Sequence, residues 1–196
     1  KLRHKNQVMK RKDFFDIAAD LYYADNLYEK AIEMWERNKG GNHTDYFQAK
    51  LAITTEINDK LDWLDKLHKY EEILKFKGKT ELIQTSHYII FNAMISSRLY
   101  AEALDYDPLE LLDKATRLIN SLANITEPEE RFANKEQLLF HLLKSDERDF
   151  IKTHINSFLE LLGNEEVIYD VLSYEGGVDI LNHLRLHRQN QFKEKV

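Results

Sequence analysis

The sequence predicts an all-α fold, an α-solenoid of stacked antiparallel helix pairs with no sheet. Apolar residues recur every three or four positions along most of the chain, as they do on the buried face of a helix. Only 6 glycines and 2 prolines occur in 196 residues, which favours helices over turns. No stretch alternates apolar and polar residues as a half-buried strand does. We therefore expect about ten helices joined by short links.

A helical hairpin over residues 14–35 is the clearest predicted element. The turn between its two helices falls at Asp25–Asn26. Small side chains would let the helices approach closely, and these are Ala18, Ala19 and Ala31. The larger apolar residues are Phe15, Tyr22, Tyr28, Ile32 and Trp35. Because one hairpin hides only part of this apolar surface, it needs neighbouring helix pairs.

Residues 14–38 resemble a tetratricopeptide repeat (TPR), a helix pair of about 34 residues. The positions that carry the resemblance are Phe15, Ala18, Ala19, Tyr22, Tyr28, Ala31, Ile32 and Trp35. Asn26 stands where the family usually has a turn glycine, and Asn38 stands where a small alanine is usual. Later segments keep only the rhythm of helix pairs. The resemblance implies a scaffold for protein interactions and no particular ligand.

Three further helices are expected before residue 100. The first runs over residues 44–57 with Thr44 as its N-cap. An apolar stripe predicts the second over residues 61–74. Thr80 is expected to cap the third, which has apolar residues on several faces and is therefore expected to be covered from more than one side.

The second half of the chain contains stronger helix-start signals. Asp107–Glu110 combines a capping side chain, a proline at the first helical position and a glutamate at the third. Thr126–Glu129 repeats this pattern. We expect a helix after each, then one over residues 145–162, a short one capped by Asn164, and a last one after Gly176–Gly177.

The net charge of −6 is unevenly distributed. Residues 1–12 hold six lysines and arginines and no acid, which indicates a basic leader or the polar end of a truncated helix. The rest, residues 13–196, is expected to form a single helical-repeat domain with 22 basic and 34 acidic residues. An acidic body argues against general nucleic-acid binding. Because the sequence starts at Lys1 rather than at methionine, we expect a fragment of a longer chain.

The sequence lacks several features that would indicate a secreted, membrane-bound or zinc-binding protein. It has no cysteine for disulfides or cysteine-based zinc sites. No apolar run approaches the ~20 residues that span a bilayer, and no signal peptide is visible. We therefore expect a cytoplasmic protein that needs no membrane, metal or cofactor. Self-association into a homodimer stays open.

We favour the hypothesis that the chain is a binding module, which is a scaffold and not an enzyme. A concave helical surface would hold a protein or peptide segment, as the sensor or regulatory part of a larger protein. The residues predicted to contribute to this groove are Tyr23, Asn26, Lys30 and Asn58.

An alternative hypothesis is catalytic. Arg148–Asp149 followed by His154 resembles the Arg-(polar)-x4-His motif of HEPN ribonucleases, which are helical and use no metal. The resemblance implies that His154 would handle the 2′-hydroxyl or leaving-group proton and that Arg148 would stabilise the phosphate charge, with Asp149 as the polar residue. A histidine that titrates near neutrality can do such work. Ordinary surface residues on a helix are the competing interpretation.

Two histidines of the last predicted helix have a spacing that metal sites use. His183 and His187 are four positions apart and therefore share one helical face. No glutamate completes an HExxH motif, and we interpret the pair as a polar helix surface. The paired glutamates at helix starts, such as Glu165 and Glu166, are interpreted as favourable to the helix dipole.

Overall fold

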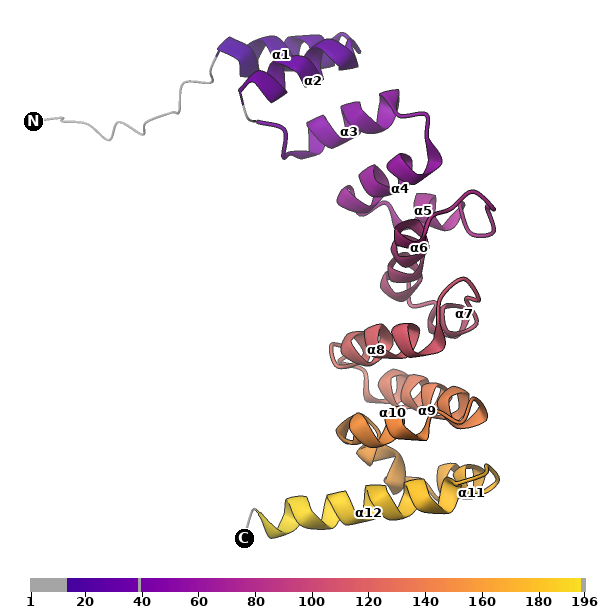
Figure 1. Cartoon of the computed structure of the whole chain (residues 1–196). Helices are drawn as coiled ribbons and strands as arrows, with labels where there is room; N and C mark the ends of the chain where they lie inside the picture. Colours follow the sequence, from indigo (N-terminus) through magenta and orange to yellow (C-terminus); the bar gives the residue numbers. More distant parts are fainter. Residues whose placement is uncertain (1–13, 39, 195–196) are drawn as a thin grey trace, which may run out of the picture. The chain divides into compact units, whose positions relative to one another are not determined.

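The structure, a computed structural model, describes residues 14–38 and 40–194, and the regular structure within them is entirely helical (Figure 1). An all-α fold without a sheet is thereby confirmed for these residues. They form twelve α-helices and two short 3-10 helices, because several predicted helices are split. The predicted basic leader at residues 1–12 lies outside the described residues.

The chain forms two compact units, an N-terminal unit that ends at Ala93 and a C-terminal unit that begins at Met94. The first helices are α1 (Phe14–Ala24), α2 (Tyr28–Arg37), α3 (Thr44–Ile53), α4 (Ile57–Lys66), α5 (Tyr70–Leu74) and α6 (Gln84–Ser96), in which the boundary falls. The others are α7 (Tyr100–Leu104), α8 (Leu111–Leu122), α9 (Pro128–Lys144), α10 (Arg148–Thr153), α11 (Glu165–Leu172) and α12 (Gly177–Lys193). The 3-10 helices η1 (Ile155–Ser157) and η2 (Leu159–Gly163) lie between α10 and α11. A single domain and a solenoid arrangement stay predictions.

The core of the N-terminal unit is rich in aromatic rings. Ala19 of α1 and Ala31 of α2 are fully buried where these two helices lie side by side (Figure 1). Trp35 is only 2% exposed, and its ring centroid lies 5.7 Å from that of Tyr23 and 6.2 Å from that of Tyr46 on α3. The predicted hairpin is therefore confirmed, with small residues at its centre as expected.

The core of the C-terminal unit is aliphatic and draws on α8, α9, α10 and α12. Its fully buried large side chains include Leu118, Leu122, Leu138, Leu139, Leu142, Ile151 and Phe158. Lys114 is a buried exception, and its Nζ donates hydrogen bonds to the carbonyl oxygens of Leu104 and Tyr106. Burial lowers the pKa of Lys114. This side chain therefore satisfies carbonyls at the end of α7 that the helix itself leaves open.

One helix–helix junction occurs four times along the described chain. At its centre a residue other than glycine has a left-handed backbone, namely Asn26 (φ 59°), His68 (φ 54°), Arg98 (φ 60°) and Asp146 (φ 59°). The N–H of Asn26 donates to the Tyr23 carbonyl (3.0 Å) and that of Leu27 to the Tyr22 carbonyl (2.8 Å), and the other three junctions repeat both bonds. The residue after the left-handed one is already the N-cap of the next helix, with φ from −83° to −89° and ψ from 50° to 65°.

Equivalent positions around the four junctions are buried. Two positions at each junction are at most 1% exposed. The one seven residues before the left-handed residue is Ala19, Leu61, Phe91 or Leu139. The one five residues after it is Ala31, Ile73, Ala103 or Ile151. A tyrosine follows the left-handed residue by two positions at three junctions, as Tyr28, Tyr70 and Tyr100. The pattern of the first hairpin thus continues along the chain in backbone geometry and burial.

The left-handed backbone at Arg98 leads to a stability prediction. We expect Arg98→Gly to be more stable than Arg98→Ala by about 1 kcal/mol, because alanine keeps the Cβ that this backbone disfavours. Both variants lose the 3.2 Å ion pair between Arg98 and Glu130, so this loss does not affect the difference between them. The Arg98 side chain is 71% exposed, so the pair itself contributes little. Urea unfolding of the two variants measures the difference, and equal stability would contradict the prediction.

Two predicted capping residues are wrong. His43, not Thr44, is the N-cap of α3, and its Nδ1 accepts a hydrogen bond from the Tyr46 N–H (3.3 Å). The helix expected to start at Thr80 begins at Gln84 instead. At α3 the capping side chain is a histidine, which capping preferences do not predict.

The strongest predicted start signal, Asp107–Glu110, is also wrong in its position. The helix α8 begins only at Leu111, with Glu110 as its N-cap. Lys114 in the first turn of α8 binds the Tyr106 carbonyl, which helps to hold the preceding residues in a turn. Pro128, in contrast, is the first residue of α9, as predicted.

Three predicted helices are split. The helix over residues 61–74 is interrupted at His68, the one after Thr80 ends before Arg98, and the one over residues 145–162 is α10 followed by η1 and η2. Apolar residues continue at spacings of three and four across each break, because the segments on both sides bury the same face. This spacing does not separate α-helix from 3-10 helix or one helix from two.

Candidate functional site

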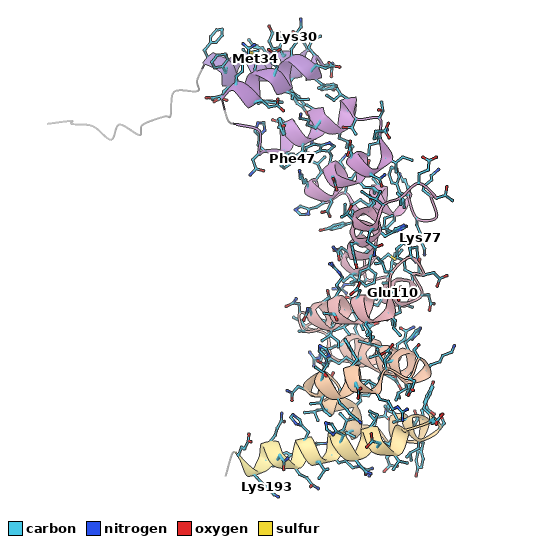
Figure 2. The ribbon with its side chains drawn as sticks, viewed as in Figure 1. Lys30, Met34, Phe47, Lys77, Glu110 and Lys193 are labelled. Carbon is cyan, nitrogen blue, oxygen red and sulfur yellow. The ribbon has the colours of Figure 1, made fainter. Side chains whose placement is uncertain are left out.

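Three of the predicted binding residues lie on the α1–α2 hairpin. Tyr23 is half-buried, and its hydroxyl donates a hydrogen bond to Gln48 Oε1 on α3 (2.6 Å). Asn26 is the left-handed residue of the turn, and its Oδ1 accepts from the Tyr28 hydroxyl (2.8 Å). Lys30 is exposed on α2, with Nζ 5.6 Å from the ring centroid of Tyr22 (Figure 2). The side chains of Tyr23 and Asn26 are thus engaged in contacts within the fold.

The fourth predicted residue, Asn58, lies on α4 and links it to the segment before α6. Its Nδ2 donates to the Glu81 carbonyl (3.2 Å), while its Oδ1 accepts from the Ile83 N–H (3.1 Å) and the Ser86 hydroxyl (2.7 Å). Ser86 is fully buried, so its hydroxyl needs this partner. The contacts of Asn58 are those of a structural residue, and they do not bring it together with the hairpin residues.

These contacts predict that Asn58→Ala lowers the free energy of unfolding by about 2 kcal/mol, because Ser86 loses its buried acceptor. Asn58→Asp is the comparison variant, since it keeps the oxygen acceptor for Ile83 and Ser86 and replaces the amide donor to Glu81 by a carboxylate oxygen. We expect it to cost about half as much. Chemical denaturation measures both values. A loss for Asn58→Ala no larger than that for Asn58→Asp would contradict this role.

A groove between α3 and α4, here called the α3–α4 groove, has a volume of about 490 Å³. It forms because α3 ends at Ile53 rather than continuing to residue 57, and the link over residues 54–56 is extended. The hydroxyl of Thr54 donates to the Lys50 carbonyl (2.6 Å) and closes the end of α3. The lining residues are Lys50, Ile53, Thr54, Thr55, Glu56, Asp59, Asp62, Trp63 and Lys66.

Trp63 is the apolar wall of the α3–α4 groove. It is half-buried and stacks on Phe47 with ring centroids 6.0 Å apart, which restricts its orientation. The ammonium of Lys66 lies 4.1 Å from the ring centroid of Trp63 on α4. A rigid, partly exposed tryptophan of this kind is the side chain that most often anchors a bound peptide.

The groove carries both signs of charge. Lys50 and Lys66 line it together with three carboxylates, those of Glu56, Asp59 and Asp62. Both classes of charge are available to a bound segment, so a polar backbone with one apolar side chain fits the lining better than a purely apolar ligand.

Lys50 is held in place from the core side of the groove. Its Nζ lies 2.8 Å from Glu36 Oε1, which also accepts from the Tyr46 hydroxyl (2.8 Å). The hydrogen bonds from Lys50 and Tyr46 lower the pKa of Glu36. Burial and the hydrogen bond to Glu36 raise the pKa of Tyr46. Glu36 therefore stays ionised near neutral pH and fixes the position of the lysine.

The residues of the alternative catalytic hypothesis lie on and just after α10. The Arg148 guanidinium pairs with Asp146 (2.5 Å) and lines a hollow of about 290 Å³ together with Asp149, Glu147, Lys152 and Asp179. Acids outnumber bases in this lining, which disfavours a phosphate backbone. His154 is not among the lining residues.

His154 itself is turned toward its own helix. Its ring stacks on Phe150 with centroids 4.1 Å apart, and Nδ1 lies 3.1 Å from the Phe150 carbonyl oxygen. The spacing of the Arg-(polar)-x4-His motif is thus present in sequence, but Arg148 and His154 do not line one hollow. No contact of Arg148 or His154 among the described residues supports joint acid–base work.

The two histidines of α12 are not arranged as a metal site. His187 Nε2 lies 2.9 Å from Asn156 Oδ1, which also accepts from Gln191 (2.8 Å), while His183 is exposed. Within residues 14–38 and 40–194 we find no group of three or more metal-ligating side chains placed to hold an ion. None of the helices described has the length and apolar character needed to cross a membrane.

Comparison with known proteins gives no match: no family model matches the chain, and no curated protein or solved structure does. The geometry of the chain's own residues is therefore the basis for assigning a function.

Proposed function

We propose that this chain is a protein-interaction module, a scaffold or regulatory part of TPR-like helix pairs that binds a peptide or protein segment. The observation that carries the proposal is the α3–α4 groove, with the half-buried Trp63 as an apolar anchor point between lysines and carboxylates. The bound segment places one apolar side chain against Trp63 and polar groups against Lys66 and Asp62. Contributions from Tyr23, Asn26 and Lys30 stay predictions.

The recurring junction supports the helix-pair part of this proposal. The left-handed residue stands at all four junctions where the TPR-like hairpin has Asn26, and Tyr100 and Ala103 repeat the spacing of Tyr28 and Ala31. Chains built from such pairs use their surfaces for binding other proteins. No contact of Arg148 or His154 favours the ribonuclease alternative.

Selection of peptides from a random display library against the whole chain tests the proposal. Trp35 is buried and Trp63 is half-buried at the groove, so we expect selected peptides to change the fluorescence of Trp63. Thr55→Arg places a bulky charge on the exposed link of the groove and should weaken binding about tenfold, whereas Ala52→Arg on α3 outside the groove should change it by less than about twofold.

Circular dichroism checks that both variants keep the wild-type fold. Equal effects of Thr55→Arg and Ala52→Arg would show that the groove is not the binding site. A library that yields no binder to the wild-type chain would contradict the proposed function itself.

A further inference from the structure

The second half of α12 carries a stripe of arginine, glutamine and phenylalanine side chains. Arg185, Arg188, Gln189 and Phe192 occupy successive positions of one helical stripe. With Leu162 of η2 and Ile168 of α11 they line a groove of about 370 Å³, here called the arginine groove. The first half of α12 is anchored in the core by Ile180, Leu181 and Leu184, so the groove rests on a fixed helix.

The arginine groove has an apolar floor that is open to solvent. Phe192 is 64% exposed, and Leu162 and Ile168 are half-buried. An aromatic ring beside two aliphatic side chains gains free energy when a further apolar group covers it. The floor is therefore suited to one large apolar side chain of a ligand.

Among the residues that the structure describes, the two arginines have no acidic partner. Within the described residues, Arg185 and Arg188 make no ion pair or side-chain hydrogen bond, and no acid lines the groove. Two acids of the same unit have lysine partners of their own, since Glu160 lies 3.0 Å from Lys135 and Asp179 lies 2.6 Å from Lys152. The forked donors of two neighbouring guanidinium groups match carboxylates.

We propose that the arginine groove is a docking site for an acidic peptide segment in which carboxylates flank a large apolar residue. The apolar side chain covers Phe192 and the carboxylates bind Arg185 and Arg188. Nucleic acid fits less well, because two positive charges release few counterions. The site lies in the other compact unit from the α3–α4 groove and rests on its own observations, so either site can fail without the other.

Fluorescence anisotropy with a labelled synthetic peptide tests this site. The probe is a peptide of about twelve residues with a leucine flanked by glutamates, and its two controls replace the glutamates by glutamines or the leucine by alanine. We expect the wild-type chain to bind the probe at least about tenfold more tightly than either control, and added salt to weaken binding.

Matched variants place the probe on the groove. Arg188→Glu should weaken binding at least about tenfold, while Lys144→Glu, an equal charge change on an exposed residue of the same unit, should change it less than about twofold. Phe192→Ala should weaken binding about fivefold and Leu186→Ala, at an exposed position of α12 outside the groove, should not. Arg188→Gln serves as a second variant if the charge reversal disturbs the fold.

Several outcomes would overturn the proposal. They are a failure of the wild-type chain to bind the probe, equal binding of the glutamine control, equal effects of Arg188→Glu and Lys144→Glu, or tighter binding of a single-stranded RNA than of the peptide at the same salt. The Thr55→Arg variant should bind the probe like the wild type, because its substitution lies in the N-terminal unit.

Discussion

Replacement of Gly177 by alanine should lower the free energy of unfolding of the C-terminal unit by about 3 kcal/mol or more. A Cβ at this position would lie 1.9 Å from the Val171 carbonyl oxygen and 2.8 Å from its carbonyl carbon. Both atoms belong to the backbone of α11 and cannot rotate away as a side chain can. The start of α12 or the end of α11 must shift, and Ile180 and Val171 in the core shift with them.

Gly163→Ala is the matched control, since a Cβ there meets nothing within 4 Å. We expect its stability to stay within about 0.5 kcal/mol of the wild type. Urea unfolding followed by far-UV circular dichroism measures both variants. The chain's 2 tryptophans, Trp35 and Trp63, both lie in the N-terminal unit, so their fluorescence follows that unit separately. Similar stabilities for Gly177→Ala and Gly163→Ala would contradict the steric argument.

Trp35→Ala should be the most costly single change in the N-terminal unit, at about 4 kcal/mol. The indole is only 2% exposed and contacts the rings of Tyr23 and Tyr46 and the ring of His43, whose centroid lies 4.7 Å away. Its removal leaves a large cavity between α2 and α3 that these rings cannot fill without moving.

Trp63→Ala provides the comparison for Trp35→Ala. Trp63 is half-buried, so part of its surface already faces solvent, and we expect its loss to cost about half as much. Circular dichroism measures both transitions, and the remaining tryptophan of each variant reports on its own surroundings. Equal losses for the two variants would show that Trp35 does not have the central role that its burial indicates.

Local chemistry predicted some parts of the fold and misplaced the helix starts at Thr44, Thr80 and Asp107–Glu110. Alanines at facing positions and an asparagine suited to a left-handed backbone predicted the first hairpin, and proline predicted the start of α9 at Pro128. The breaks at His68 and Arg98 could not be predicted in this way. Arginine does not favour a left-handed backbone, and histidine, although enriched there, adopts it at only a minority of its positions. Hydrogen bonds across the junction and burial on both sides stabilise it.

One signal for those breaks was nevertheless present in the sequence. In three places a buried residue follows a tyrosine by three positions, and these pairs are Tyr28–Ala31, Tyr70–Ile73 and Tyr100–Ala103. Alignment on these pairs places Asn26, His68 and Arg98 at equivalent positions. This tyrosine spacing is recognisable only by comparison of the later segments with the first pair, Tyr28–Ala31.

The candidate site was harder to predict than the fold. Asn58 is predicted as a groove residue because it is assigned to the first helix of the following pair, yet its amide bonds with the segment before α6 and with Ser86. The α3–α4 groove exists because α3 stops at Ile53, and the Thr54 side chain that closes its end gives no such signal in sequence. Its lining comes from two helices and the link between them, so only the folded chain brings these residues together.

The recurring junction also has a consequence for how the chain reaches its native state. Each junction closes through hydrogen bonds between residues at most five positions apart. Little loop-closure entropy opposes such contacts, and proteins dominated by them cross their folding barrier quickly. A pair such as α1–α2 can therefore form while later residues are still being added at the ribosome.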